Sequence, residues 1–94
     1  MNSTDLVLNI AVNMGRLSRW AQEGKKERIK QFITDTDWYI DQIDEVAVKL
    51  QFRPTLKAFK EKYNLMKQDI RLDRDWAEDA LTWANVLTHR AKLA

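Results

Sequence analysis

The sequence contains no cysteine, one proline and only two glycines. Without cysteine the chain can form neither disulfides nor thiolate metal sites, which is compatible with a reducing compartment. With so little proline and glycine, few positions force the backbone to turn. In addition, β-branched residues never alternate with polar ones in the two-residue period of a strand. These absences together favour an all-α fold.

The charge shows no strong excess of one sign, because the chain has 16 basic and 14 acidic residues and a net charge of +2. Such a balance does not single out nucleic acid as a partner. The N-terminal segment has no basic region, and its apolar run is interrupted by Asn9 and Asn13, so we expect neither a signal peptide nor a membrane span. The composition, 45% hydrophobic and 32% charged, is ordinary for a soluble protein. We therefore expect one cytoplasmic domain over residues 1–94.

The strongest periodic signal in the chain lies between Ile29 and Leu50. Seven residues recur there at alternating spacings of four and three, which places them on one stripe of a helix: Ile29, Ile33, Thr36, Ile40, Ile43, Ala47 and Leu50. This pattern predicts a helix over residues 26–51. The segment from Thr34 to Asp37 is poor helix material, because these side chains compete for backbone hydrogen bonds, and it is a candidate kink.

A preceding helix should begin near Ser3 or Thr4, either of which can cap it. Its apolar stripe comprises Val7, Ile10, Met14, Leu17 and Ala21, and a neighbouring strip is small: Ala11, Gly15 and Ser18. We expect the small strip to admit a bulky side chain or a close neighbouring backbone. Gly24 suits the cap that ends this helix. The alternative is one helix that runs straight through Gly24.

Arg53-Pro54 is the clearest boundary, because proline disfavours helix for the residue before it and suits the start of the next helix. A third helix then carries apolar residues at core spacing: Leu56, Phe59, Tyr63, Met66 and Ile70. We expect a break near Leu72–Arg74 and a fourth helix from Asp75, which has capping-box spacing to Glu78. This helix has an aromatic face (Trp76, Ala80, Trp83, Leu87) and a small-residue face (Ala77, Ala84, Ala91).

Four amphipathic helices with short connections predict an antiparallel four-helix bundle. If the turns at Gly24 and Leu72–Arg74 were instead continuous helix, the chain would form a long helical hairpin. Such a hairpin would leave apolar stripes uncovered and would have to dimerise into a bundle.

No pattern of residues supports catalysis, a metal or a cofactor. Metal sites in bundles need Glu-x-x-His pairs, whereas this chain has one histidine, His89, and no such pair. Asp35, Asp37 and Asp41 resemble the opening of a calcium loop, but isoleucine and valine stand where the glycine and the bidentate glutamate are required. We therefore expect neither an enzyme nor a cofactor.

The third helix presents a row of cations: Lys57, Lys60, Lys67, Arg71 and Arg74. Such a row is able to follow a phosphate backbone. However, the second helix has a matching acidic face, and pairing outward from the turn sets Glu45 beside Lys60, Asp41 near Asn64 and Lys67, and Asp37 or Asp35 near Arg71. We favour this charge zipper over nucleic acid, because the acids that it needs are present.

A second basic cluster surrounds the first turn and comprises Arg16, Arg19, Lys25, Lys26, Arg28 and Lys30. Glu23 and Glu27 dilute this cluster, so a solvated helix end is the simpler interpretation. The five cations other than Lys30 are the residues that a nucleic-acid interface would add to the row on the third helix.

Trp38 is out of place, because it lies about 200° around the helix from Thr36 and Ile40. A tryptophan on a polar face either covers a loop or faces a partner. We therefore expect a small non-enzymatic helical module for protein–protein contact, such as an adaptor, assembly factor or regulatory subunit, which also self-associates. The expected contact residues are Trp38, Asp41, Gln42 and Glu45. The alternative is a nucleic-acid-associated protein that uses the two basic sets.

Overall fold

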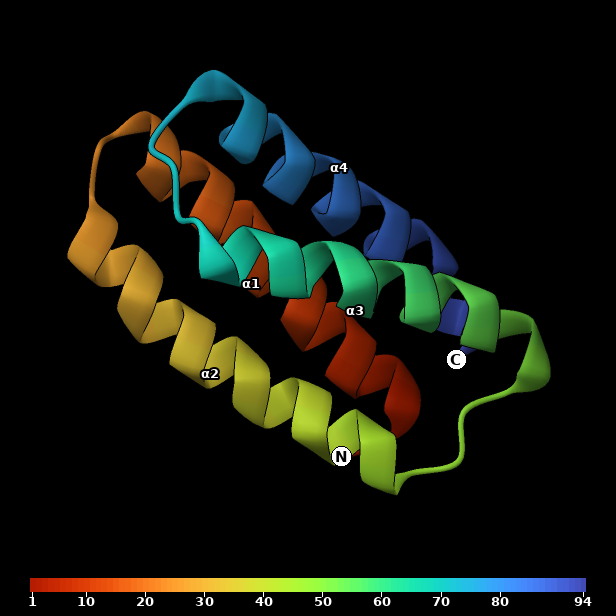
Figure 1. Ribbon diagram of the computed structural model, residues 1–94. Helices are drawn as coiled ribbons and strands as arrows, with labels where there is room; N and C mark the ends of the chain where they lie inside the picture. Colours follow the sequence, from red (N-terminus) through yellow and green to blue (C-terminus); the bar gives the residue numbers. More distant parts are fainter.

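Four helices follow one another up and down in the computed structural model, which describes residues 1–94 except for the side chain of Glu45 (Figure 1). They are α1 (Ser3–Gln22), α2 (Lys26–Glu45), α3 (Arg53–Gln68) and α4 (Arg74–Arg90), with short 3-10 turns at Leu50–Phe52 and Ala91–Leu93. The predicted all-α four-helix bundle is confirmed. The helical-hairpin alternative is wrong, because the chain breaks both after α1 and after α3.

The turn between α1 and α2 depends on Gly24, whose φ of 70° is the left-handed conformation that suits glycine. The Gly24 N–H donates to the carbonyl of Ala21 at 3.2 Å, and the Lys25 N–H donates to the carbonyl of Trp20 at 2.9 Å. This pair of bonds is a Schellman motif, which satisfies carbonyls that the helix end would leave unpaired. The chain therefore turns at Gly24, as the sequence predicts.

The second helix ends at Glu45, not at the predicted Gln51. Its last turn carries acidic residues and no basic one, which opposes the helix dipole, and Val46 is already extended. Val46 and Val48 pack against the core, whereas Ala47 and Leu50 of the predicted stripe are exposed. The segment from Thr34 to Asp37 stays helical, and the Thr36 hydroxyl donates to the carbonyl of Phe32 at 2.7 Å.

Two predicted helix caps are wrong by one or two residues. Asn2, and not Ser3 or Thr4, caps α1: its Oδ1 accepts from the Asp5 N–H at 2.8 Å. Asp73, and not Asp75, caps α4: its Oδ1 accepts from the Trp76 N–H at 2.8 Å. In each case the residue just before the helix has an extended backbone, which lets its side chain reach the helix's third N–H group. The predicted break near Leu72–Arg74 is confirmed.

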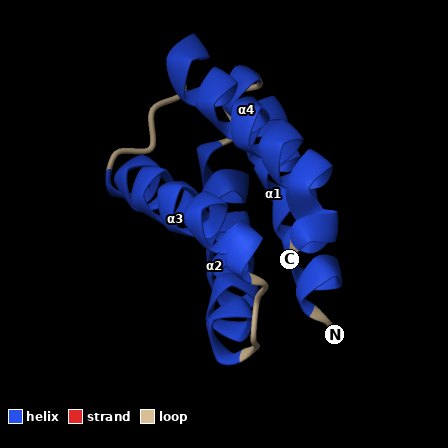
Figure 2. Ribbon diagram, turned by 90° about the vertical axis from the view of Figure 1, so that its right-hand side faces the viewer, coloured by secondary structure: helices blue, strands red, loops and turns tan.

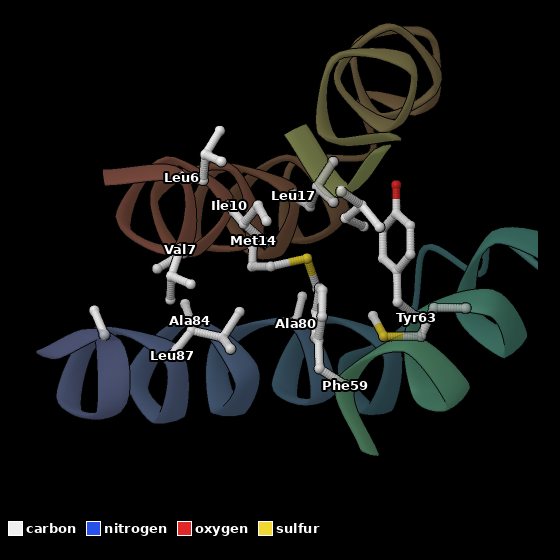
Figure 3. Close-up of a cluster of buried hydrophobic side chains, with 14 of the residues drawn as sticks. Leu6, Val7, Ile10, Met14, Leu17, Phe59, Tyr63, Ala80, Ala84 and Leu87 are labelled. Carbon is white, nitrogen blue, oxygen red and sulfur yellow. The ribbon is translucent and has the colours of Figure 1, made fainter. Parts of the chain in front are cut away.

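The seam between α1 and α4 is built from small side chains, and Figure 3 shows Ala80 and Ala84 of α4 facing α1. A Cβ atom placed on Gly15 would lie 3.9 Å from the Cβ of Ala84. The buried Ser18 hydroxyl donates to the carbonyl of Ala77 at 2.7 Å. The small strip of the first helix thus admits a close neighbouring backbone, as expected.

The other helices attach to this seam through larger side chains. Figure 2 shows α3 beside α2, and α4 beside α1. Trp20 of α1 meets Phe32 of α2, with ring centroids 4.6 Å apart. Phe59 of α3 reaches Trp83 of α4 with centroids 5.6 Å apart, and the Trp76 indole N–H donates to the carbonyl of Met66 at 3.1 Å. The core therefore lies between all four helices.

Candidate protein-interaction surface

Trp38 lies on the outer face of α2 and is 55% exposed. Thr36 and Ile40, on the opposite face of the same helix, are buried. The indole meets the ring of the adjacent Tyr39 edge-on, with centroids 5.2 Å apart and planes at 77°. The predicted place of Trp38 on the polar face of its helix therefore holds in the structure, and the position leaves a large apolar group in contact with solvent.

A shallow depression beside the indole is lined by Gln31, Phe32, Thr34, Asp35 and Trp38. All five residues belong to α2, so the surface around the indole is built on one helix and not on a loop. A binding surface on a regular helix is held more rigidly than one on a loop.

Residues of α1 fix one rim of this depression. Asn13 is only 2% exposed, and its Nδ2 donates to the Asp35 carboxylate at 2.9 Å. The Arg16 guanidinium donates to Asn13 Oδ1 at 3.3 Å and lies 5.6 Å from the centroid of the Phe32 ring. These contacts orient Asp35 and Phe32 before any partner binds.

Of the other predicted contact residues, neither Asp41 nor Gln42 lines this depression. At 100° per residue, Gln42 lies about 40° to one side of Trp38 and Asp41 about 60° to the other. Gln42 is half-buried, whereas Asp41 is exposed and lines a separate cleft that α2 forms with α3. The side chain of Glu45 lies outside the described residues. Asp41 and Gln42 therefore flank the indole on its two sides and do not surround it.

The predicted row of cations does not lie on one helix, because α3 ends at Gln68 and Arg71 lies in the connection to α4. Four of its five cations form ion pairs. Lys60 Nζ lies 2.8 Å from Asp44, and Lys67 Nζ lies 3.2 Å from Asp37. Arg71 pairs with Asp73 at 3.1 Å, and Arg74, which opens α4, pairs with Glu78 at 3.0 Å. Lys57 is exposed.

A charge zipper between α2 and α3 is therefore present, but its register differs from the predicted one. Lys67 takes Asp37, which was expected beside Arg71, while Asp41 shares a cleft with Asn64 and Lys67, as expected. The register moved because α2 ends early and an extended segment replaces the tight turn near Phe52.

Tyr63 anchors this zipper from the core side. It is only 2% exposed, and its hydroxyl lies 2.7 Å from the Asp37 carboxylate and 3.1 Å from the carbonyl of Ile33. Burial raises the pKa of Tyr63 above its ordinary value, and the hydrogen bond to Asp37 and the charge of Asp37 raise it further. The hydroxyl therefore stays protonated and acts as a donor.

The basic cluster lies around the turn between α1 and α2, whereas Asp44 lies at the opposite end of α2. Arg16, Arg19, Lys25, Lys26 and Arg28 are all exposed. Lys25 pairs with Glu23 at 3.0 Å, and the Arg28 guanidinium lies 5.6 Å from the ring centroid of Trp20. Trp20 itself is buried at 8% exposure, so it offers no open platform on which a base would stack.

Neither a metal centre nor a membrane span was found in the part of the chain that the structure describes. No three His, Asp or Glu side chains gather there as a metal site would require. His89 is exposed in the last turn of α4. Over the same residues, no helix combines the length and the apolarity that crossing a bilayer needs.

The buried hydrogen bond of Asn13 and the contact between Tyr63 and Asp37 were not predicted from the sequence. Asn13 had a usable signal, because it falls at helical spacing among Ile10, Leu17 and Trp20, which are all buried. A polar residue within an apolar arc predicts a buried hydrogen bond. Tyr63 was predicted to be in the core, but its partner depends on the register of α3 against α2.

Comparison of the chain with protein-family models, with curated proteins and with solved structures finds no match.

Proposed function

We propose that this protein is a small non-enzymatic module that binds another protein through the outer face of α2. The single observation that carries the proposal is the 55% exposure of Trp38 on that face. Tryptophan is enriched among the residues that dominate binding energy at interfaces, because it buries a large area at little conformational cost. The module would serve as an adaptor, an assembly factor or a regulatory subunit in the cytoplasm. A chain without cysteine needs no disulfides and is compatible with that reducing compartment.

The surroundings of Trp38 favour a partner of defined chemistry. Gln31 and Thr34 supply polar groups beside the indole, and Asp35 adds a carboxylate whose orientation Asn13 fixes. A matching partner has an apolar pocket for the indole and a rim of cationic or amide donors for the carboxylate. Because α1 already holds this rim in place, binding requires little further ordering of the module.

The test is an affinity pull-down from nuclease-treated lysate of the source organism, with the wild type, Trp38→Ala and Leu65→Ala as baits. Leu65 is the matched control, because it is an apolar residue on α3 that is 63% exposed. A defined protein that copurifies with the wild type and with Leu65→Ala, but not with Trp38→Ala, supports the proposal. If the same proteins copurify with all three baits, or if no protein copurifies with any of them, the proposal is contradicted.

The alternative is association with nucleic acid through the exposed cations at the first turn. Arg16, Arg19, Lys25, Lys26 and Arg28 support it by their exposure, whereas the ion pairs of Lys60 and Lys67 weaken the contribution of α3. Binding through these cations should fall steeply as salt is raised, and contact through Trp38 should not. Repeating the pull-down without nuclease over a salt series separates the two functions.

Self-association into a homodimer is part of the proposal. Because we assign the outer face of α2 to the heterologous partner, a second copy of this chain needs a different surface.

A further inference from the structure

The outer face of α1 carries a second set of exposed residues, on the side away from the core. Leu8 and Val12 are 38% and 52% exposed, whereas Leu6, Val7 and Leu17 of the same helix are buried. Four exposed residues share this face at spacings of three, four and seven: Asp5, Leu8, Val12 and Arg19. That is the spacing of a helical seam that packs against another helix.

The charged ends of this stripe are complementary when the helix is reversed about Val12. Asp5 lies seven residues before Val12 and Arg19 seven residues after it, so each charge lies about 10 Å along the axis from the centre. Both side chains are exposed, and neither forms an ion pair with the described side chains of its own chain. An antiparallel second helix therefore brings each Asp5 opposite the Arg19 of the other copy.

At the centre of the same arrangement Val12 meets Val12 of the other copy, and the two Leu8 side chains lie on either side of that contact, each opposite position 16 of the other copy. Next along this face, Leu81 of α4 and Gln22 of α1 line a common depression, and Leu81 is 46% exposed.

We propose that a second copy of this chain docks on α1 in antiparallel orientation, with Val12 at the two-fold axis and with Asp5 of each copy paired with Arg19 of the other. The interface is isologous, as closed dimers require. It rests on the self-association in the proposed function and names the surface that performs it. It leaves the Trp38 face of α2 free for a heterologous partner.

The charge pairs give the decisive experiment, which is sedimentation velocity over a concentration series. Asp5→Arg alone and Arg19→Asp alone each set like charges against each other twice, and each should weaken the dimer at least about tenfold. An equimolar mixture of the two single variants restores both attractive pairs, so dimers should reappear in the mixture. The variant that carries both substitutions should dimerise with itself for the same reason.

Val12→Lys tests the centre of the stripe, and Leu65→Lys on α3 is its matched control. Val12→Lys should abolish the dimer, whereas Leu65→Lys should leave it unchanged. Circular dichroism melts of every variant verify that the monomer is folded. A folded wild type that stays monomeric at all concentrations overturns the proposal, as does a dimer that survives Val12→Lys or a mixture no more associated than its components.

The outcome is separable from that of the pull-down. Val12→Lys as bait should still capture any protein that depends on Trp38, because the two residues lie on different helices and outer faces. A lost dimer with retained capture supports both surfaces as independent. Loss of dimer and capture together contradicts the independence of the two surfaces.

Discussion

The seam between α1 and α4 and the seam between α2 and α3 join their helices by different means. In the first, Gly15 faces Ala84, and the Ser18 hydroxyl bonds to a carbonyl of the opposite backbone. In the second, Lys60 and Lys67 reach Asp44 and Asp37 across partly exposed surface. Close apolar packing stabilises through excluded water and dispersion, whereas exposed ion pairs contribute little each and mainly fix register. The difference predicts where substitutions are costly.

The largest effect is expected where α3 reaches the first seam. Phe59 is fully buried, and Figure 3 shows it extending from α3 towards Met14 and Ala80. Phe59→Ala leaves a cavity that rigid neighbours cannot close, so the free energy of unfolding should fall by about 3–5 kcal/mol. Urea denaturation measures this change. Leu65→Ala, on the exposed side of α3, should stay within about 0.5 kcal/mol, and similar losses for both would contradict the packing described.

The next effect comes from enlarging a small residue in the first seam. Ala84→Leu adds three carbon atoms where the helix backbones are close, and overpacking of this kind costs about 1–3 kcal/mol. Thermal denaturation should show a melting temperature lowered by several degrees. Asn85→Leu is the control, because it places the same side chain on an exposed position of α4. If the Ala84 variant melts like the wild type, the seam is looser than the structure indicates.

The second seam is probed by Tyr63→Phe, which keeps the buried ring and removes the donor to Asp37. The loss should be about 1–2 kcal/mol at neutral pH, since the hydrogen bond is made to a charged group and Lys67 still contacts the carboxylate. The measurement is urea denaturation of both proteins.

The effect of Tyr63 also depends on pH. The pKa of Tyr63 is raised in the folded state, whereas tyrosine in the unfolded chain ionises near pH 10. The contribution of Tyr63 to the free energy of unfolding is therefore complete below about pH 10. It is lost as the pH rises above that value, because only the unfolded chain then releases the tyrosine proton. The gap in stability between wild type and Tyr63→Phe should narrow above about pH 10. A gap that widens there would contradict the raised pKa.

The smallest effect is expected for the ion pairs of the second seam. Lys60→Ala should cost between about 0 and 1 kcal/mol, and less as salt is raised. A double-mutant cycle with Asp44→Ala isolates the coupling between the two side chains. A coupling as large as the loss from Ala84→Leu would remove the contrast between the two seams.

Local signals in the sequence predicted much of the fold. Gly24 and Pro54 act through their own backbone preferences, so the boundaries that they mark were predictable. The small strip around Gly15 indicated either a bulky side chain or a close neighbouring backbone, and the structure has the second. The end of α2 was not predictable from its stripe, because Ala47 and Leu50 fit the helical period equally well. Tertiary packing of Val46 and Val48 decided it.

The candidate site was predictable only in part. The exposed position of Trp38 follows from its angle on one helix, which spacing alone fixes. The separation of Asp41 from Gln42 depends on where α3 lies against α2. Likewise, Asp73 and Asp75 are both good caps two residues apart, and only the observed extended backbone at Asp73 distinguishes them.

The tight seam between α1 and α4 also joins the two helices that are most distant in sequence. Ser18 and Ala77, which it connects, are 59 residues apart, whereas the contact of Trp20 with Phe32 closes a short hairpin. Closing a longer loop costs more chain entropy, and folding slows as contacts become less local. We therefore expect the α1–α2 hairpin to form early and the seam to form after the folding barrier. Substitutions in the seam would then accelerate unfolding and leave the folding rate nearly unchanged.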